Sequence, residues 1–302
     1  MKQGVNLLMQ HPVRLSLFLG WIVLFSQQLE PITLLTEYGF YSLLGVVGAL
    51  FANATGAGGG VVFVPFFHHL QFSTQSVVAT SFAIQCCGMS AGAITWWRYK
   101  VNHHQDDPQW GALSRTLVLT VPASLFGVWF AQYAPHYIDV LNSFKDGFSQ
   151  LHIAFGWFSI MLSLAIFASI PLLNRVALQH KVTRMDVMVL PLISFLGGII
   201  TAWLSVGVGE IVAVYLIIRG FNVTMAIALA VILSAFTVWG AIVFHLAITQ
   251  AVVWEVVLFA GAGAIIGGTL AKYLVLVFSA QTLKCFFGVW VLLLGLSGMP
   301  IF

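Results

Sequence analysis

The chain has 302 residues, of which 60% are hydrophobic and only 7% are charged. Soluble domains carry roughly a quarter charged residues, so this composition excludes a soluble globular protein and indicates an integral membrane protein. The formal net charge of +3, from 12 Lys and Arg against 9 Asp and Glu, is no indication of nucleic-acid binding, because basic residues also collect in the cytoplasmic loops of membrane proteins.

Nine apolar segments follow one another along the chain. Their lengths suit helices that cross a hydrocarbon core of about 30 Å, and not the short alternating strands of a barrel. The predicted fold class is therefore all-α, with a single transmembrane domain over residues 1–302. The segments are 13–29, 39–70, 75–97, 111–133, 150–173, 185–219, 222–247, 251–277 and 281–299.

Segments 39–70 and 185–219 are longer than one span needs, since a straight helix of their length would reach about 50 Å. Each contains a glycine-rich break near its middle, Asn53–Gly60 in the first and Ser205–Glu210 in the second. Glycine is a poor helix former and lets a backbone come close to a ligand. The two segments are either bent full spans or re-entrant hairpins.

The basic residues favour the re-entrant alternative. If both long segments crossed fully, the clusters around Arg98 and Arg175 would lie outside, against the positive-inside rule. If both are re-entrant, every basic residue except Lys145 is cytoplasmic, as is the N-terminus, and the acidic linker from Glu30 to Glu37 is outside.

This topology divides the chain into two units of opposite orientation, about 13–133 and about 150–277, with 281–299 as an extra helix. Corresponding residues of the two breaks align at an offset of 151, namely Gly56, Gly58 and Val61 with Gly207, Gly209 and Val212. The shared order of features predicts inverted repeats. In transporters with such repeats, the binding site lies at interrupted helices near the middle of the membrane.

The run from Gly56 to Pro65, followed by Val78-Ala79-Thr80-Ser81, resembles the N-terminal signature of the sulfite exporter TauE/SafE family, also called the toluene sulfonate uptake permease family. The resemblance covers roughly residues 40 to 299. It implies a carrier of small anions, often sulfur-containing, in the bacterial cytoplasmic membrane. The second break departs from the family pattern, because Glu210 stands where Gly59 stands in the first.

The two breaks form the expected substrate site. Half-helices beginning near Gly60 and near Glu210 would point free backbone N–H groups, and the positive ends of their dipoles, at one cavity suited to an oxyanion. The residues expected to bind the substrate are Asn53, Thr55, Gly56, Gly58, Gly59, Gly60, Ser81, Gln85, Ser205, Gly207 and Gly209, with Thr80 and Ser234 as further candidates. The alternative is that the glycines only permit close helix packing and that each hydroxyl bonds its own helix backbone.

Glu210 is an ionisable residue placed at membrane depth. A charge there costs ~3 kcal/mol or more, so burial favours the protonated carboxyl. The hypothesis is that Glu210 takes up and releases a proton during transport and thereby couples proton movement to anion movement. The alternative is a neutral residue at a helix start, bonded to nearby N–H groups.

No metal site, cofactor or enzymatic activity is expected. The histidine pairs at 68–69 and 103–104 lack ligand partners at helical spacing, and no nucleotide-binding loop or nucleophile–base pair is visible. The prediction is a secondary anion transporter working by alternating access, with a fixed-pore anion channel or a non-transporting scaffold subunit as alternatives. The expected partners are a small anionic substrate and the lipid bilayer, with a homo-oligomer left open and no nucleic acid.

Overall fold

The structure, a computed structural model, describes residues 12–137, 151–171 and 179–297. Every regular element in these ranges is a helix, and five of the described helices are long and apolar enough to cross a membrane. The prediction of an all-α polytopic membrane protein is confirmed.

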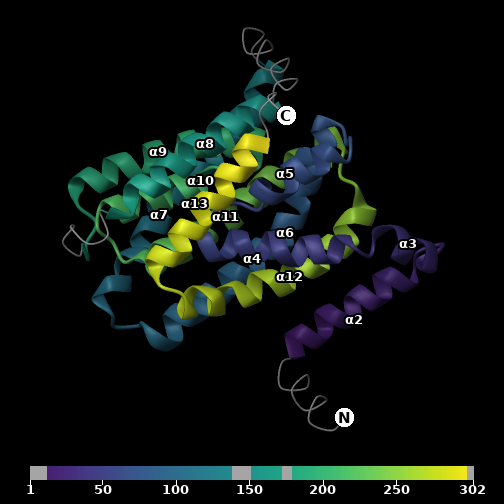
Figure 1. The fold of residues 1–302 in the computed structure, drawn as a ribbon, viewed down its shortest axis with the longest axis horizontal. Helices are drawn as coiled ribbons and strands as arrows, with labels where there is room; N and C mark the ends of the chain where they lie inside the picture. The colour runs from purple at the N-terminus through teal and green to yellow at the C-terminus, as the bar shows by residue number, and fades with distance from the viewer. Residues whose placement is uncertain (1–11, 138–150, 172–178, 298–302) are drawn as a thin grey trace.

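The helices follow the predicted segments, with both long segments divided in two (Figure 1). They are α2 (Pro12–Ser26), α3 (Pro31–Tyr38), α4 (Tyr41–Thr55), α5 (Gly60–His69), α6 (Thr74–His103), the 3-10 turn η1 (Pro108–Trp110), α7 (Ala112–Tyr137), α8 (Leu151–Ser169), α9 (Arg184–Leu204), α10 (Val208–Ile218), α11 (Val223–Phe244), the π-helical turn η5 (His245–Thr249), α12 (Trp254–Val277) and α13 (Ala280–Ser297).

The first long segment is a hairpin made of α4 and α5. Helix α4 ends where Gly56 adopts a left-handed conformation with φ of 80°, which glycine tolerates because it has no Cβ. The two helices then double back on each other, since the ring of Tyr41, at the start of α4, lies 6.2 Å from the ring of Phe67, near the end of α5. Both ends of this segment therefore lie at the same end of the bundle.

The second long segment is a hairpin made of α9 and α10. Asp186, in the first turn of α9, accepts hydrogen bonds from the hydroxyl of Tyr215 at 2.7 Å and from Nε of Arg219 at 2.9 Å, at the end of α10. The arms are unequal, with 21 residues in α9 and 11 in α10.

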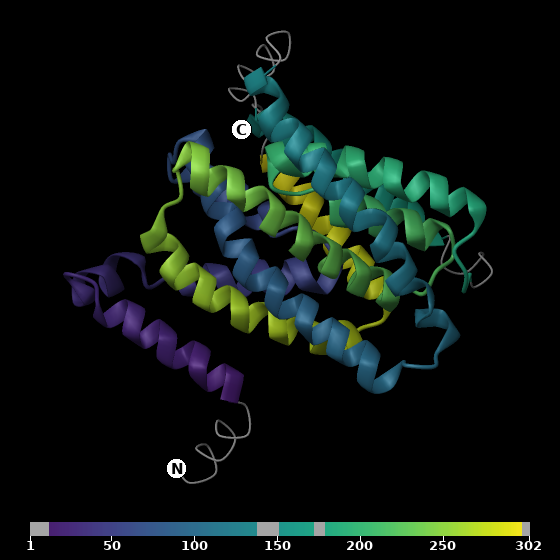
Figure 2. The same ribbon diagram turned by 180° about the vertical axis from the view of Figure 1, so that it is seen from behind.

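The two hairpins enter the bundle from opposite ends (Figures 1 and 2). Helices α6 and α11, which follow the hairpins, run antiparallel at the centre. Phe82 of α6 lies 5.4 Å from the ring of His245 after α11, whereas Asn222 before α11 bonds Gln109 after α6. This is the arrangement that inverted repeats predict; the repeat relation between the two units itself stays a prediction.

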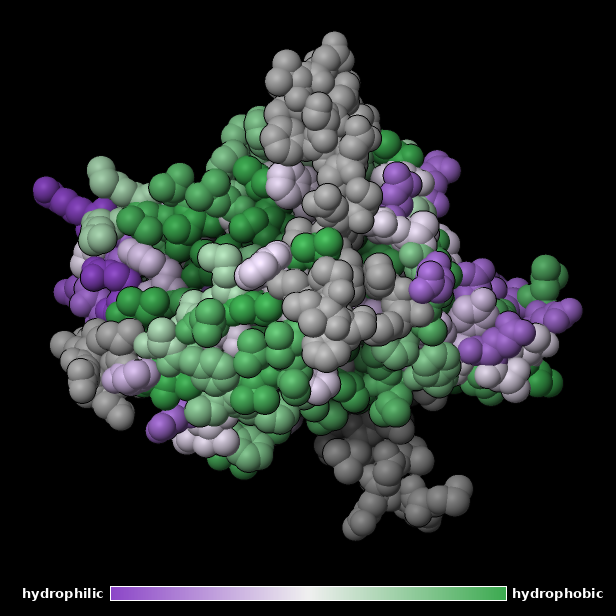
Figure 3. Space-filling view, turned by 45° about the horizontal axis from the view of Figure 1, so that its top comes forward, coloured by the Kyte–Doolittle hydropathy of each residue, from purple (hydrophilic) through white to green (hydrophobic). Residues whose placement is uncertain are grey.

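Hydrophilic side chains gather toward the two ends of the bundle, and a broad apolar surface lies between them (Figure 3). Described basic residues meet at the end where the second hairpin opens, where Lys272 lies over the ring of Tyr99 at 5.4 Å and Lys100 bonds Ser114 at 2.8 Å. Arg175, together with Lys2 and Lys145, lies outside the described residues.

Small residues allow the straight helices to approach one another closely. A Cβ at Gly45 of α4 would overlap the carbonyl oxygen of Ala260 in α12, and one at Gly263 of α12 would overlap that of Ser42 in α4. Gly45 and Gly263, which lie within continuous helices, therefore serve close helix packing, the alternative role proposed above for the glycines of the two breaks.

The acidic linker from Glu30 to Glu37 is mostly helical; its placement outside the membrane stays a prediction. Pro31 occupies the start of α3, where its missing N–H costs nothing and its fixed φ suits a helix. Helices α3 and α4 meet at a bend of 50°, so the chain turns into the first hairpin through this helix.

A labelling experiment tests the topology. With the native cysteines replaced, we expect a membrane-impermeant maleimide to label Ser73→Cys and Gln105→Cys from opposite sides of the membrane, because these positions flank the two ends of α6. Labelling of both from the same side would contradict α6 as a full span of the membrane.

Candidate functional site

The tips of the two hairpins meet in the interior, and one carboxylate bridges them. Glu210, only 2% exposed, accepts a hydrogen bond at Oε1 from the backbone N–H of Gly58 at 2.7 Å. Its Oε2 accepts one from the N–H of Gly207 at 2.9 Å. Gly58 precedes α5 and Gly207 precedes α10, so the side chain joins the N-terminal ends of both half-helices.

The sequence places Glu210 where it can make this bridge. It is the third residue of α10, from which a carboxylate reaches back to the N–H of the residue before the helix. Two helix N-termini and two N–H donors stabilise a negative charge, and each charge-assisted hydrogen bond contributes about 1.5–3 kcal/mol. Because both oxygens accept, the arrangement fits the ionised carboxyl.

A second cluster of hydrogen bonds ties α6 to both tips. The side-chain oxygen of Gln85 accepts from the N–H of Gly59 at 2.8 Å, and its amide nitrogen donates to the hydroxyl of Ser205 at 2.7 Å and to that of Ser81 at 3.1 Å. Ser205 in turn donates to Ser81 at 3.0 Å. All three side chains are buried, so these four residues form one closed polar network.

The tip glycines also bring the two backbones into contact. A Cβ at Gly60 would overlap the carbonyl oxygen of Ser205, and a Cβ at Gly209 would overlap the carbonyl oxygen of Gly56 and the hydroxyl of Ser234. A binding role and a packing role are therefore compatible for these glycines. Because glycine has no side chain, the two helix ends come close enough to share one carboxylate.

Three predicted residues have other partners. Asn53 joins α4 to α6, since its amide nitrogen donates to the carbonyl oxygens of Ala49 at 2.8 Å and Gly88 at 3.4 Å. Thr55 bonds its own helix, at the carbonyl of Phe51, as the alternative interpretation of the hydroxyls expects. Thr80 accepts from the N–H of Val253 at 3.0 Å, before α12.

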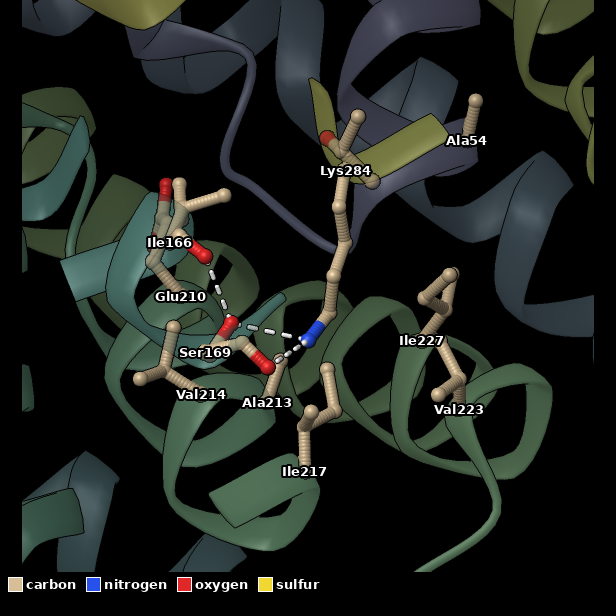
Figure 4. A pocket seen from close by; sticks show the side chains of 11 residues that line it. Ala54, Ile166, Ser169, Glu210, Ala213, Val214, Ile217, Val223, Ile227 and Lys284 are labelled. Atoms are coloured by element: carbon tan, nitrogen blue, oxygen red, sulfur yellow. Dashed lines mark hydrogen bonds between the residues drawn. The ribbon is translucent and has the colours of Figure 1, made fainter. Parts of the chain in front are cut away.

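A small cavity adjoins Glu210 on the side of α8 and α13 (Figure 4). Its volume is about 40 Å³, and one water molecule needs about 10–15 Å³ by the same measure. The lining residues are Ala54, Thr55, Ile166, Ser169, Glu210, Ala213, Val214, Ile217, Val223, Ile227 and Lys284.

Lys284 and Ser169 of this cavity were not among the predicted site residues. Lys284 is 8% exposed and donates to the hydroxyl of Ser169 at 2.8 Å. The available signal was that Lys284 lies inside the last apolar segment, where an ionisable residue points to function. The topology places Lys284 among the cytoplasmic basic residues, and this placement gives no indication that its side chain is buried.

With this geometry in place, the comparison with known families identifies the chain. The model of the family described as Sulfite exporter TauE/SafE matches residues 41–298. The chain belongs to this family. No curated protein and no solved structure gives a match.

Membership in the TauE/SafE family makes the chain a membrane transporter of the sulfite or anion exporter class. The matched residues 41–298 include both hairpins and the helices α6 and α11 that follow them. The Glu210 bridge and the cavity beside it therefore lie within the region that the family model covers.

The described histidines and cysteines of this TauE/SafE chain do not gather into a metal site: no three His, Cys, Asp or Glu residues lie together in the described ranges. His104 bonds Asp107 at 2.8 Å in the turn after α6 and stacks on Trp110. The pKa of Asp107 lies below its ordinary value because its carboxylate accepts a hydrogen bond from the N–H of Gln109 and, to a smaller extent, because it bonds His104. The 68–69 pair has no described side chains.

The contact between the tips gives a prediction for Gly60→Ala. We expect the added methyl group to push against the Ser205 carbonyl and to lower the free energy of unfolding by about 1–3 kcal/mol, the usual cost of overpacking. The measurement is thermal unfolding of the purified protein. Gly20→Ala is the matched control, since nothing lies within 4 Å of a Cβ there; equal melting temperatures for the two variants would contradict the contact.

Proposed function

We propose that this TauE/SafE chain is a secondary carrier that moves sulfite, a sulfonate or another small organosulfur anion across the cytoplasmic membrane by alternating access. The observation that carries the proposal is the bridge from Glu210 to the N–H groups of Gly58 and Gly207. Two backbone donors at two helix N-termini that hold a carboxylate also suit a sulfite or sulfonate oxygen, which is likewise an anionic acceptor.

The substrate and Glu210 compete for the same donors. An ionised Glu210 occupies the N–H groups of Gly58 and Gly207 and repels a second anion, the more strongly because the surroundings are apolar. A protonated carboxyl is a weaker acceptor and carries no charge, so it releases the donors and can itself donate a hydrogen bond. Proton binding and anion binding therefore favour each other, which couples the anion to a proton.

The bridge also connects protonation to movement. Gly58 belongs to the first hairpin and Glu210 to the second, and the two hairpins open at opposite ends of the bundle. Protonation of Glu210 weakens a bond between them. A displacement of one hairpin unit relative to the other would then open the tips toward each side of the membrane in turn.

In this proposal the end where the second hairpin opens faces the cytoplasm, because Arg184, Arg219 and Lys272 lie there. The N-terminal residues 1–11, which the topology places on the same side, lie outside the described residues. The substrate is the small anion, and the bilayer surrounds the apolar surface of Figure 3.

Flux into proteoliposomes tests the carrier itself. We expect saturable uptake of sulfite and of methanesulfonate, with exchange against unlabelled anion inside the vesicle. Uptake that follows the membrane potential without saturation would indicate an anion channel, and absence of flux would indicate a scaffold subunit; both results would contradict the proposal.

The proton coupling predicts a specific loss in Glu210→Gln. Methanesulfonate is the substrate to use, because its charge stays constant over the working pH range. We expect KM of the wild type to fall on acidification, by at most about tenfold per pH unit for one proton, and KM of Glu210→Gln to stay nearly constant. The glutamine mimics the protonated carboxyl.

Glu255→Gln is the control for that series, since Glu255 is an exposed carboxylate in the first turn of α12. It should keep the pH dependence of the wild type. Lys284 is the other ionisable side chain on the cavity that Glu210 lines, so the series is repeated in Lys284→Met. A Glu210→Gln protein with the pH dependence and rate of the wild type would refute the coupling.

A further inference from the structure

Lys284 is a buried cation whose partners are neutral. Its ammonium donates to the hydroxyl of Ser169 at 2.8 Å and to the carbonyl oxygen of the same residue at 3.4 Å. An ammonium has three N–H groups, so one is left over among the described residues. Neither of the described ion pairs involves Lys284, although an isolated charge at this depth is costly.

The leftover N–H adjoins the cavity that also contains Glu210 (Figure 4). Lys284 comes from α13, Ser169 from the end of α8, and Glu210 from the start of α10. The close-up shows the Lys284 side chain extending across the pocket to Ser169, with the aliphatic residues of α10 and α11 forming the other walls. A cation with spare donor capacity and a carboxylate that binds the tip donors thus line one cavity.

We propose that Lys284, held in position by Ser169, forms a subsite for a small oxyanion in this cavity, next to the hairpin tips. The Ser169 hydroxyl itself donates to the carbonyl oxygen of Ile166 at 2.6 Å. The subsite rests on the proposed anion transport. It gives the incoming or outgoing anion a counter-charge at the stage when Glu210 still occupies the N–H groups of Gly58 and Gly207.

The size of the cavity restricts the ligand. A volume of about 40 Å³ corresponds to about three or four water molecules by that measure, which suits the three oxygens of sulfite or methanesulfonate. The walls are mostly aliphatic, among them Ile166, Val214 and Ile217, and contribute no donors to a large polar ligand. An aromatic sulfonate is too large for the subsite as it stands.

The ammonium also suits an anion better than it suits Glu210. Both carboxylate oxygens of Glu210 already accept backbone N–H groups, and no ion pair joins Glu210 to Lys284. An oxyanion between them can accept from the free N–H of Lys284 without breaking the bonds to Ser169.

Equilibrium binding of radiolabelled sulfite and methanesulfonate to the purified full chain tests the subsite. We expect Lys284→Met, which keeps the length of the side chain and removes its charge, to weaken binding on the order of 10-fold or more. Lys284→Arg should retain most of the affinity. The matched control is Lys272→Met, an end-of-bundle lysine over the rings of Tyr99 and Tyr273, for which we expect a change within about twofold.

A second variant keeps the test decisive if Lys284→Met does not fold. In a background without native cysteines, Lys284→Cys can be treated with an aminoethyl methanethiosulfonate, which forms a mixed disulfide bearing an ammonium and releases methanesulfinate. The subsite predicts that this reagent restores anion binding and that the uncharged methyl methanethiosulfonate does not. Equal binding after both reagents, or wild-type affinity in Lys284→Met, would overturn the subsite.

The two proposals fail in different ways. If the wild type takes up sulfite and Lys284→Met takes it up with unchanged KM, the carrier stands and the subsite is wrong. If the wild type binds sulfite through Lys284 but shows no flux, the subsite stands and the carrier is wrong. A wild type that binds neither sulfite nor methanesulfonate would refute both.

Discussion

The contact on which the rest of the structure depends is the pair of hydrogen bonds from Gly58 and Gly207 to the carboxylate of Glu210. Helices α5 and α10 present their N-terminal ends to each other, and these ends carry like partial charges of about +0.5. In an apolar interior they would repel and their N–H groups would lack acceptors. An anion between them is therefore needed for the two tips to meet at all.

The surrounding helices make that meeting possible. Helices α6 and α11 occupy the centre and run antiparallel, and α6 contributes Gln85, which satisfies the N–H of Gly59 and holds Ser205 in place. Glycines remove the side chains that would separate the backbones, at Gly60 between the tips and at Gly45 between α4 and α12. Close packing of small residues thus brings the helices together around the polar centre.

Much of this centre could be predicted from the sequence, because its signals are local. A glycine run inside an overlong apolar segment and a carboxylate in its counterpart mark the tips without any knowledge of tertiary contacts. Asn53 could not be placed in the same way, since its partner Gly88 is 35 residues away on another helix. Lys284 and Ser169 are 115 residues apart, and only the packing of α8 against α13 reveals that they face one cavity.

The Glu210 bridge has a consequence for the protein without substrate. A carrier whose helix ends were bare when unloaded would resist changing conformation empty, and would tend toward strict one-for-one exchange. Here the carboxylate of Glu210 covers both helix ends in the protein without substrate. In the proposed carrier, Glu210 would therefore serve as the protein's own counter-ion at the helix ends when no substrate is bound.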